Sequence, residues 1–489
     1  MVTATNRAMW LRLCAVAGLI ALWAGPVAGG ERAKYVFLMI GDGMGSVQRT
    51  AAELFANADT MSTDRLGSIK QLVMNDMPVE GLTYTHSANS LITDSAAAGT
   101  ALACGQKTDN GVVSMDPTGK TTLTTIAERA KAAGMKVGII TSVSIDHATP
   151  ACFYAHQPKR SSYGDIAMQL PQSGFDFFGG AATPVDRSRG ERQMSPVEAA
   201  RAAGYAVVTT RAELAAVRSP KAWAFDEPTD SAAAMPYAID RSSDTMSLAE
   251  LTRKAIELLD NPKGFFIMVE GGKIDWACHQ NDAATAVHET LAFDDAVAQA
   301  VDFHRKHPSD TLLVVTADHE TGGMTLGFAA GGPVKPARLA GQTMSYERFG
   351  RHVARWRDAG TAFDDALPVI RQAFGYEALS PDELTRIKVA YAASMKPGHR
   401  PKKGSAEYAL YGPRDPLTVT CLRLVGEQAG IGFASFSHTG VPVPTTAMGP
   451  GSERFGGYHD NTEIPDHIAS AMGLVAAEAA HHQRLSSPR

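Results

Sequence analysis

Continuous apolar runs recur along the chain at intervals. The first run, from Tyr35 to Ile40, contains no charged or amide side chain and stops at the glycine-rich segment 41–45. Three later runs are also mostly apolar: 136–142, 264–270 and 311–316. Runs that are apolar at nearly every position, rather than at alternate positions, indicate strands buried on both faces of a sheet.

Segments of helical periodicity separate these runs. Apolar residues recur with helical spacing in three of them: 121–133, 248–259 and 282–306. Strands that alternate with helices predict an α/β fold with a large, mostly parallel central sheet covered by helices on both faces. In such sheets ligands bind at the carboxyl ends of the strands. We therefore expect Asp42, Glu270 and Asp318, each at the end of an apolar run, to lie along one edge of the sheet.

The pattern changes between residues 332 and 421. This region is rich in Pro, Arg and Ala, and helical stretches occur at 345–358, 363–374 and 381–395, followed by a basic loop at 396–403. We interpret 332–421 as a helical insertion within a core domain formed by 31–331 and 422–489. No residue in it stands out for chemistry, so its default role is a cap over the core or a contact between subunits.

Residues 1–30 have the pattern of a secretory signal peptide. Arg7 and Arg12 precede an apolar run, Leu13 to Trp23, and small residues suited to a signal peptidase follow it. The run is shorter than the ~20 residues that a spanning helix needs, and no later stretch reaches that length. We expect cleavage, a periplasmic or secreted location, and no membrane span in the mature form. An uncleaved membrane anchor is the alternative interpretation.

Composition narrows the range of functions. The 489 residues are 44% hydrophobic and 20% charged, which is ordinary for a globular protein. A net charge of −5 argues against nucleic acid as a specific partner, because the surface lacks a strong positive field. Four cysteines follow the predicted signal: Cys104, Cys152, Cys278 and Cys421. They fit no zinc-finger spacing, and they leave open one or two disulfides whose pairing cannot be read from the sequence.

Two motifs carry specific chemistry. The segment 93–102 places Ser95 at the start of a helix of small residues, where free amide donors and the helix dipole stabilise an alkoxide and an incoming phosphate. In isolation, Ser95 would be better explained as a helix N-cap. Asp275 and His279 lie one helical turn apart, so that together they can chelate one zinc ion. A capping Asp with a hydrogen-bonded core His is the alternative for that pair.

These motifs, with Asp42 in a Gly-Asp-Gly-Met-Gly segment, the dipeptide Asp318-His319 and the later His438, resemble those of the alkaline phosphatase family in the family's order. The resemblance runs from residue 35 to residue 463. It implies hydrolysis of phosphate monoesters to an alcohol and inorganic phosphate through a phosphoserine intermediate on Ser95. It also implies product inhibition by phosphate and suggests a homodimer.

The resemblance further implies two Zn2+ ions and one Mg2+ ion. The implied ligands are Asp275, His279 and His438 for one zinc, Asp42, Asp318 and His319 for the second, and Asp42, Thr149 and Glu270 for the third cation. Arg160 would hold the phosphate oxygens. Family members carry either aspartate or histidine where this chain has His147. Since a neutral imidazole is a better ligand for zinc than for magnesium, His147 favours Zn2+ at the third site.

Other functions are compatible with parts of this pattern. A sulfatase of the same superfamily would need a Cys/Ser-x-Pro-x-Arg segment, and the residues after Ser95 do not supply one. A phosphodiesterase shares the two-metal frame, so that comparing mono- and diester substrates distinguishes it. A periplasmic phosphate- or zinc-binding protein without activity would give no product in a phosphatase assay with zinc added.

Overall fold

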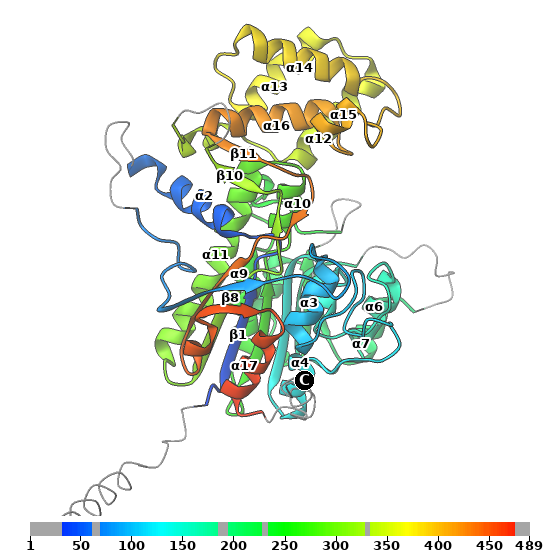
Figure 1. Cartoon of the computed structure of the whole chain (residues 1–489). Coiled ribbons are helices and arrows are strands. Elements are labelled where there is room, and N and C mark those ends of the chain that lie inside the picture. Colours follow the sequence, from blue (N-terminus) through cyan, green and yellow to red (C-terminus); the bar gives the residue numbers. More distant parts are fainter. Residues whose placement is uncertain (1–31, 61–68, 184–193, 227–232, 328–332, 475–489) are drawn as a thin grey trace, which may run out of the picture.

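The chain folds around a ten-stranded sheet (Figure 1). The computed structural model describes residues 32–60, 69–183, 194–226, 233–327 and 333–474. The strands of the sheet are β1 (Tyr35–Ile40), β2 (Val79–Tyr84), β3 (Lys136–Ser144), β4 (Phe177–Ala181), β5 (Ala206–Val208), β6 (Ala222–Asp226), β7 (Phe265–Glu270), β8 (Thr311–Thr316), β13 (Val443–Met448) and β14 (Gly457–Asp460). Their order is β14-β2-β13-β8-β1-β7-β3-β4-β6-β5.

The sheet is parallel except at one strand. Within the described ranges, β13 runs antiparallel to both β2 and β8, and every other strand pair of this sheet is parallel. The prediction of a mostly parallel α/β sheet is therefore confirmed. Four shorter strands lie outside it: β9 (Glu320–Thr321), β10 (Met324–Leu326), β11 (Ile431–Phe433) and β12 (His438–Thr439).

Helices cover both faces of the sheet. The helices of the core are α2 (Ser46–Ala56), α3 (Ser95–Cys104), α4 (Ile126–Ala132), α5 (Ala148–Ala151), α6 (Tyr163–Gln169), α7 (Pro196–Ala202), α8 (Arg211–Ala216), α9 (Leu248–Leu259), α10 (Lys273–His279), α11 (Ala283–Lys306) and α17 (Glu463–Met472). Alternate residues of β1 belong to two separate cores. Phe37 packs on one face with α9 and α11, whereas Leu38 packs on the opposite face with α3, α4 and α17. Burial on both faces explains why β1 is apolar throughout.

Most predicted elements agree with the structure within a few residues. The helix predicted over 121–133 is shorter, because α4 begins only at Ile126. Thr125 caps it: its hydroxyl accepts from the Glu128 amide, and the Glu128 carboxylate accepts from the Thr125 amide. This capping box fixes the start of the helix and leaves residues 121–124 outside it.

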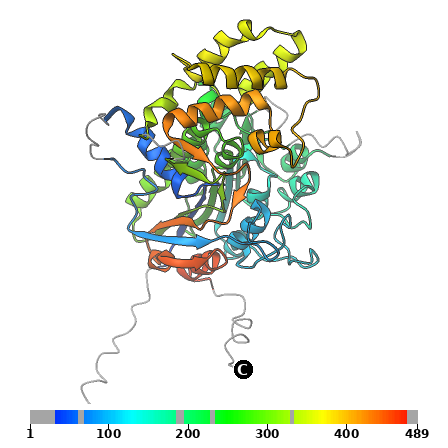
Figure 2. The same cartoon turned by 45° about the horizontal axis from the view of Figure 1, so that its top comes forward.

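The helices from 346 to 429 gather beyond one end of the sheet, as Figures 1 and 2 show. They are α12 (Tyr346–Ala359), α13 (Phe363–Phe374), α14 (Pro381–Ser394), α15 (Ala406–Tyr411) and α16 (Pro416–Ala429), and four 3-10 turns complete the described elements: η1 (Ala58–Thr60), η2 (Ala238–Asp240), η3 (Pro336–Gly341) and η4 (Ser452–Phe455). Position 421, the predicted end of the insertion, falls inside α16. This helix packs against α11 of the core as well as against α12, α13 and α14, so that it joins the two parts.

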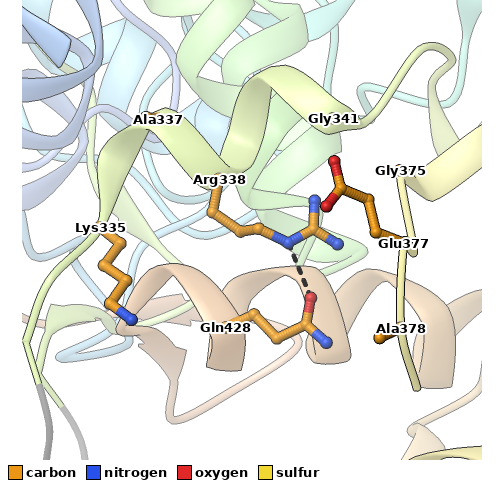
Figure 3. A pocket seen from close by; sticks show the side chains of 8 residues that line it. All are labelled: Lys335, Ala337, Arg338, Gly341, Gly375, Glu377, Ala378 and Gln428. Atoms are coloured by element: carbon orange, nitrogen blue, oxygen red, sulfur yellow. Dashed lines mark hydrogen bonds between the residues drawn. The ribbon is translucent and has the colours of Figure 1, made fainter. Parts of the chain in front are cut away.

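A cavity of about 710 Å3 lies where this helical region begins (Figure 3). Arg338 of η3 crosses it: Nε donates to Gln428 Oε1 at 2.8 Å, and Nη2 donates to the Phe374 carbonyl at 3.1 Å. None of the residues assigned to chemistry lines this cavity. Its contacts tie η3 to α13 and α16, which is a structural role.

The remaining predictions concern the signal peptide, membrane spans and disulfides. Residues 1–30, the predicted signal peptide, lie outside the described ranges. None of the helices that are described is both long enough and apolar enough to cross a membrane. The four cysteines of the described chain are all free, so no disulfide links any two of them.

Candidate active site

The predicted carboxylates meet at one edge of the sheet. Strands β8, β1 and β7 are neighbours, and Ile40 pairs in register with both Thr316 and Glu270. Glu270 ends β7, whereas Asp42 and Asp318 follow β1 and β8 by two residues. All three carboxylates are fully buried. This is the strand-end arrangement that open parallel sheets use for ligands.

A first group of potential ligands consists of Asp275, His279 and His438. His279 Nε2 lies 3.3 Å from Asp275 Oδ2, and His438 Nε2 lies 3.5 Å from Asp275 Oδ1. The remaining ring nitrogens face carbonyls: His279 Nδ1 donates to Phe436 O at 2.7 Å, and His438 Nδ1 donates to Thr93 O at 2.8 Å. Because each Nδ1 carries the proton in these bonds, each neutral ring keeps the Nε2 lone pair for a cation.

Strand β12 places His438 in this group. It pairs antiparallel with β9, which follows Asp318-His319 directly, so that His438 lies opposite Thr321. The rings of His319 and His438 stack with centroids 3.6 Å apart. A residue far along the sequence thereby joins the strand-end cluster.

A second group shares Asp275 with the first. It consists of Asp42, Asp275 and His319, whereas the sequence had suggested Asp42, Asp318 and His319. Asp318 lies against the same imidazole, with Oδ2 3.2 Å from His319 Nε2, and Asp42 Oδ1 is 3.5 Å from that nitrogen. Thr321 also orients the group, since its hydroxyl donates to Asp275 Oδ1 at 2.5 Å and contacts His319 Nδ1 at 3.2 Å.

A third group consists of Asp42, His147 and Glu270. The Thr141 hydroxyl donates to Glu270 Oε2, which leaves Oε1 without a partner. Thr149, which the sequence had suggested for this site, lies on α5 just after His147 and is fully buried. The structure thus brings together potential ligands for three cations.

The unpaired atoms of these groups fit divalent cations. Several buried polar atoms have no hydrogen-bond partner: both carboxylate oxygens of Asp42, Asp318 Oδ2, Glu270 Oε1, His147 Nδ1 and Thr149 Oγ1. Buried polar atoms are rarely left unpaired, and oxygen and imidazole donors of this kind are ligands of zinc and magnesium. Bound cations would satisfy these atoms and neutralise the crowded carboxylates.

The protonation of these side chains without cations agrees with this interpretation. Burial, reinforced by the neighbouring carboxylates, raises the pKa of Asp42 and of Asp318 well above the usual value. Burial also raises the pKa of Glu270 to about 7. Burial and the nearby Arg160 lower the pKa of His147 to about 3, which keeps the imidazole neutral and able to bind a metal ion.

Ser95 is the first residue of α3, and its side chain is buried. Its Oγ lies 3.3 Å from His319 Nε2, beside the second group of ligands. The N-cap of α3 is Asp94, which accepts from the Ala97 amide at 3.0 Å, so the capping alternative for Ser95 is wrong. The Ser95 hydroxyl is therefore available for chemistry at a helix N-terminus.

Arg160 is held beside Asp94, the residue before Ser95, by two contacts. Nη1 lies 3.0 Å from Asp94 Oδ2, and Nη2 lies 3.2 Å from His147 Nε2. The other Asp94 oxygen accepts from the amides of Ala97 and Gly111. Burial lowers the pKa of Arg160, but Asp94 and other nearby groups together raise it by more. The guanidinium therefore stays protonated and positively charged.

Sequence reasoning missed Asp94, Thr321 and Trp276. Asp94 caps α3 and also positions Arg160, and its place directly before Ser95 in a helix-start motif was the available indication. The Trp276 ring lies edge-on to His147 with centroids 5.8 Å apart. Thr321 and Trp276 have no sequence pattern that separates them from ordinary packing residues.

Comparison with known proteins agrees with this geometry. The sequence model of the family "Alkaline phosphatase" matches residues 33–178 and 176–474. Alkaline phosphatase 4 of Bacillus subtilis (strain 168) is 31% identical over 441 residues, which cover 88% of this chain and 87% of that protein.

Solved structures are similar over the same extent. The cold-active alkaline phosphatase of the psychrophile Shewanella sp. superposes with a TM-score of 0.74 at 32% identity, covering 90% of this chain and 99% of that chain. A variant of the alkaline phosphatase of the Antarctic bacterium TAB5, with one His replaced by Asp and Mg bound in its M3 site, gives a TM-score of 0.62 at 25% identity. That match covers 91% of this chain and 99% of the other.

Proposed function

Since this chain belongs to the alkaline phosphatase family and is a phosphomonoester hydrolase, we propose that Ser95 is its nucleophile and is phosphorylated during turnover. The observation that carries the proposal is the position of the Ser95 hydroxyl. Ser95 begins α3, and its hydroxyl lies 3.3 Å from His319 Nε2 within the cluster of buried carboxylates and imidazoles.

We infer that three divalent cations are held at this site. Asp275, His279 and His438 would hold one zinc, and Asp42, Asp318 and His319 a second one, with Asp275 close to both. Asp42, Thr149 and Glu270 would hold the third cation, together with His147. When bound, such cations supply positive charge that stabilises the oxygens attacking and leaving phosphorus.

The reaction would pass through two displacements on phosphorus. In the first, Ser95 Oγ forms a bond to phosphorus while the ester P–O bond breaks, and the alcohol leaves with the proton lost by the serine. In the second, a water oxygen bonds to phosphorus, the bond to Oγ breaks, and the serine regains a proton as phosphate departs. The amides at the start of α3 and the guanidinium of Arg160 bind the phosphoryl oxygens throughout.

The proposed function is tested by comparing two substrates. The enzyme supplied with zinc and magnesium should hydrolyse p-nitrophenyl phosphate far faster than bis(p-nitrophenyl) phosphate. Arg160 and the α3 amides favour the doubly charged group of a monoester over the singly charged diester. A faster diester reaction would identify a phosphodiesterase, and no product from either ester would indicate a protein that only binds phosphate or zinc.

Replacing Arg160 by alanine should weaken phosphate binding. A bidentate guanidinium contact is lost and Asp94 is left without its cation, so that KM and the inhibition constant of free phosphate should rise about tenfold to a hundredfold. Steady-state kinetics with phosphate as inhibitor measures both constants. Arg160→Lys is the matched variant. It keeps the positive charge but lacks the planar guanidinium that makes two parallel hydrogen bonds, so it should recover only part of the affinity. Equal phosphate affinity in parent and Arg160→Ala contradicts the role.

We also propose zinc rather than magnesium at the third site. The neutral imidazole of His147 supports this choice, because nitrogen ligands favour zinc and magnesium prefers oxygen. The TAB5 variant that holds Mg in its M3 site has Asp in place of a His, which agrees with the same ligand preference. Three further proposals concern the whole chain. We propose that it is exported through the predicted signal peptide, that it forms a homodimer, and that residues 332–421 are a helical insertion within the core domain.

A further inference from the structure

Glu320 is a buried carboxylate beside the potential ligands, and it belongs to none of their three groups. It is the first residue of β9. Its Oε1 accepts hydrogen bonds from Gln48 Nε2 at 2.8 Å and from the Met324 amide at 3.2 Å. Its Oε2 accepts from the Thr439 hydroxyl at 2.5 Å and from the Gly323 amide at 3.1 Å. Because these donors occupy the lone pairs of both oxygens, Glu320 is not itself a metal ligand.

The hydrogen bonds of Glu320 join three separate parts of the chain. Gln48 lies on α2, and its amide also donates to the Thr321 carbonyl at 2.9 Å, so that α2 holds β9 from one side. The amides of 323–324 belong to the turn from β9 to β10, and Thr439 lies on β12 next to His438. The carboxylate is therefore the point at which α2, this turn and β12 meet.

The glycine-rich segment 41–45 makes room for this carboxylate. A Cβ added to Gly45, the last residue of the segment, would lie 2.5 Å from Glu320 Cγ, which is closer than two such atoms can approach. The φ of Gly45 is −78°, a value that any residue adopts, so the need for glycine comes from the close packing. The segment that supplies Asp42 to the ligand groups thus also admits Glu320.

Little regular structure holds the backbone at His438. Strand β12 is two residues long and forms with β9 a separate two-stranded sheet. Ladders of this size are marginally stable on their own. By contrast, Asp42 and Asp318 follow strands in the interior of the ten-stranded sheet. The hydrogen bond from the Thr439 hydroxyl to Glu320 therefore adds a side-chain tie where the backbone pairing is weakest.

We propose that Glu320 is a positioning residue for His438. Its carboxylate fixes β12 against α2 and the turn after β9, and this keeps the His438 imidazole close enough to Asp275 for both to hold one zinc ion. This inference rests on the proposed function in one respect, since it takes the first group as a zinc site. Residues that orient metal ligands in this way contribute about tenfold to a hundredfold to metal affinity.

Thr439→Val tests the tie with a small change. The variant removes the hydroxyl that donates to Glu320 and keeps the branched shape of the side chain. The Kd of one zinc ion should rise about tenfold to a hundredfold, while the other cations are retained. Competition with a chelator, followed by elemental analysis, measures the zinc content without reference to activity. Thr439→Ser keeps the hydroxyl and should retain the zinc affinity of the parent.

Glu320→Gln should weaken binding of the same zinc ion. In either orientation of the new side chain, its amide nitrogen faces a backbone N–H, that of Gly323 or that of Met324. The double variant with Thr439→Val should lose less than the product of the two separate fold-changes, because both substitutions act on one hydrogen bond. Thr446→Val is the matched control. The buried Thr446 hydroxyl on β13 donates to the Met74 carbonyl at 2.8 Å, and its removal should leave zinc affinity unchanged.

Kinetics separates positioning from a general loss of structure. Thr439→Val should need more zinc for half-maximal hydrolysis of p-nitrophenyl phosphate, and at saturating zinc its kcat should come within about twofold of the parent. A general structural defect would instead give a low kcat that added zinc does not restore.

Several outcomes would overturn the inference. Unchanged zinc affinity in Thr439→Val would do so, and so would an equal loss in Thr446→Val or a double variant whose loss equals the product. If Glu320→Gln fails to fold, the comparison of Thr439→Val with Thr439→Ser still decides. A parent that binds zinc but hydrolyses no p-nitrophenyl phosphate would refute the proposed function, while the zinc affinities would still test the role of Glu320.

Discussion

Ser95→Ala is expected to reduce kcat for p-nitrophenyl phosphate by about a thousandfold or more. The substitution removes the atom that would bond to phosphorus and little else, since Asp94 rather than Ser95 caps α3. The remaining groups still bind phosphate, so that a small residual rate through direct attack by water is expected. Metal content and Tm should stay close to those of the parent. Steady-state kinetics, elemental analysis and thermal unfolding measure the three quantities.

Ser46→Ala is the matched control for this prediction. Ser46 is also the first residue of a helix, α2, but its side chain is exposed. Its substitution should leave kcat unchanged. Acid quenching of the parent during turnover should give a peptide phosphorylated at Ser95, and this label should be missing in Ser95→Ala. An undiminished kcat in Ser95→Ala, or a label on another residue, contradicts the assignment.

The centre of the fold could be predicted because its strands are buried on both faces. The runs that became β1 and β8 were assigned with the bounds that the structure has, and Leu248–Leu259 was predicted as the helix that is now α9. Continuous apolar strands and amphipathic helices are the patterns that sequence reasoning reads best. The strand-end position of Asp42 and Asp318 followed from the same patterns.

Neither edge of the sheet was predicted. At the edge formed by β14, β2 and β13, the reason is that the strands are polar. Strands β2, β13 and β14 contain Gly, Pro and Thr, which favour turns or fit no period-two pattern. Their polar side chains are satisfied by one another: Thr445 Oγ1 on β13 lies 2.6 Å from Thr83 Oγ1 on β2 and 2.7 Å from Thr316 Oγ1 on β8. These hydrogen bonds form only when the strands lie side by side, so they cannot be predicted from the local sequence.

The composition of the ligand groups shows a similar limit. The i, i+4 spacing of Asp275 and His279 predicted a local pair. That Asp275 also lies in one group with Asp42 and His319 depends on the tertiary packing of α10, which the spacing does not reveal. Asp94 was visible in the motif around Ser95. Its pairing with Arg160, which is 66 residues away in the chain, was not.

Removal of bound cations is expected to abolish activity and to destabilise the protein. Without cations, the buried carboxylates of Asp42, Asp318 and Glu270 lie close together with unpaired oxygens, which is costly in a site closed to water. A chelator should lower activity by about a thousandfold and lower Tm by several degrees, since cations at 1,000 times Kd contribute about 4 kcal/mol. Elemental analysis, activity and thermal unfolding before and after dialysis measure these changes. Zinc should restore activity, and magnesium alone should not.

His147→Asp separates the third site from the other two. An aspartate there supplies oxygen in place of nitrogen, so that the variant should bind less zinc and more magnesium than the parent when both are offered, while the Asp275 and His319 groups keep their ions. The readout is the metal content of the dialysed protein, which does not depend on activity. Identical zinc and magnesium contents in parent and variant would remove His147 from the site. A chelated parent with full activity and unchanged Tm would contradict the cation sites as a whole, because the unpaired oxygens of Asp42 and Glu270 would then need another explanation.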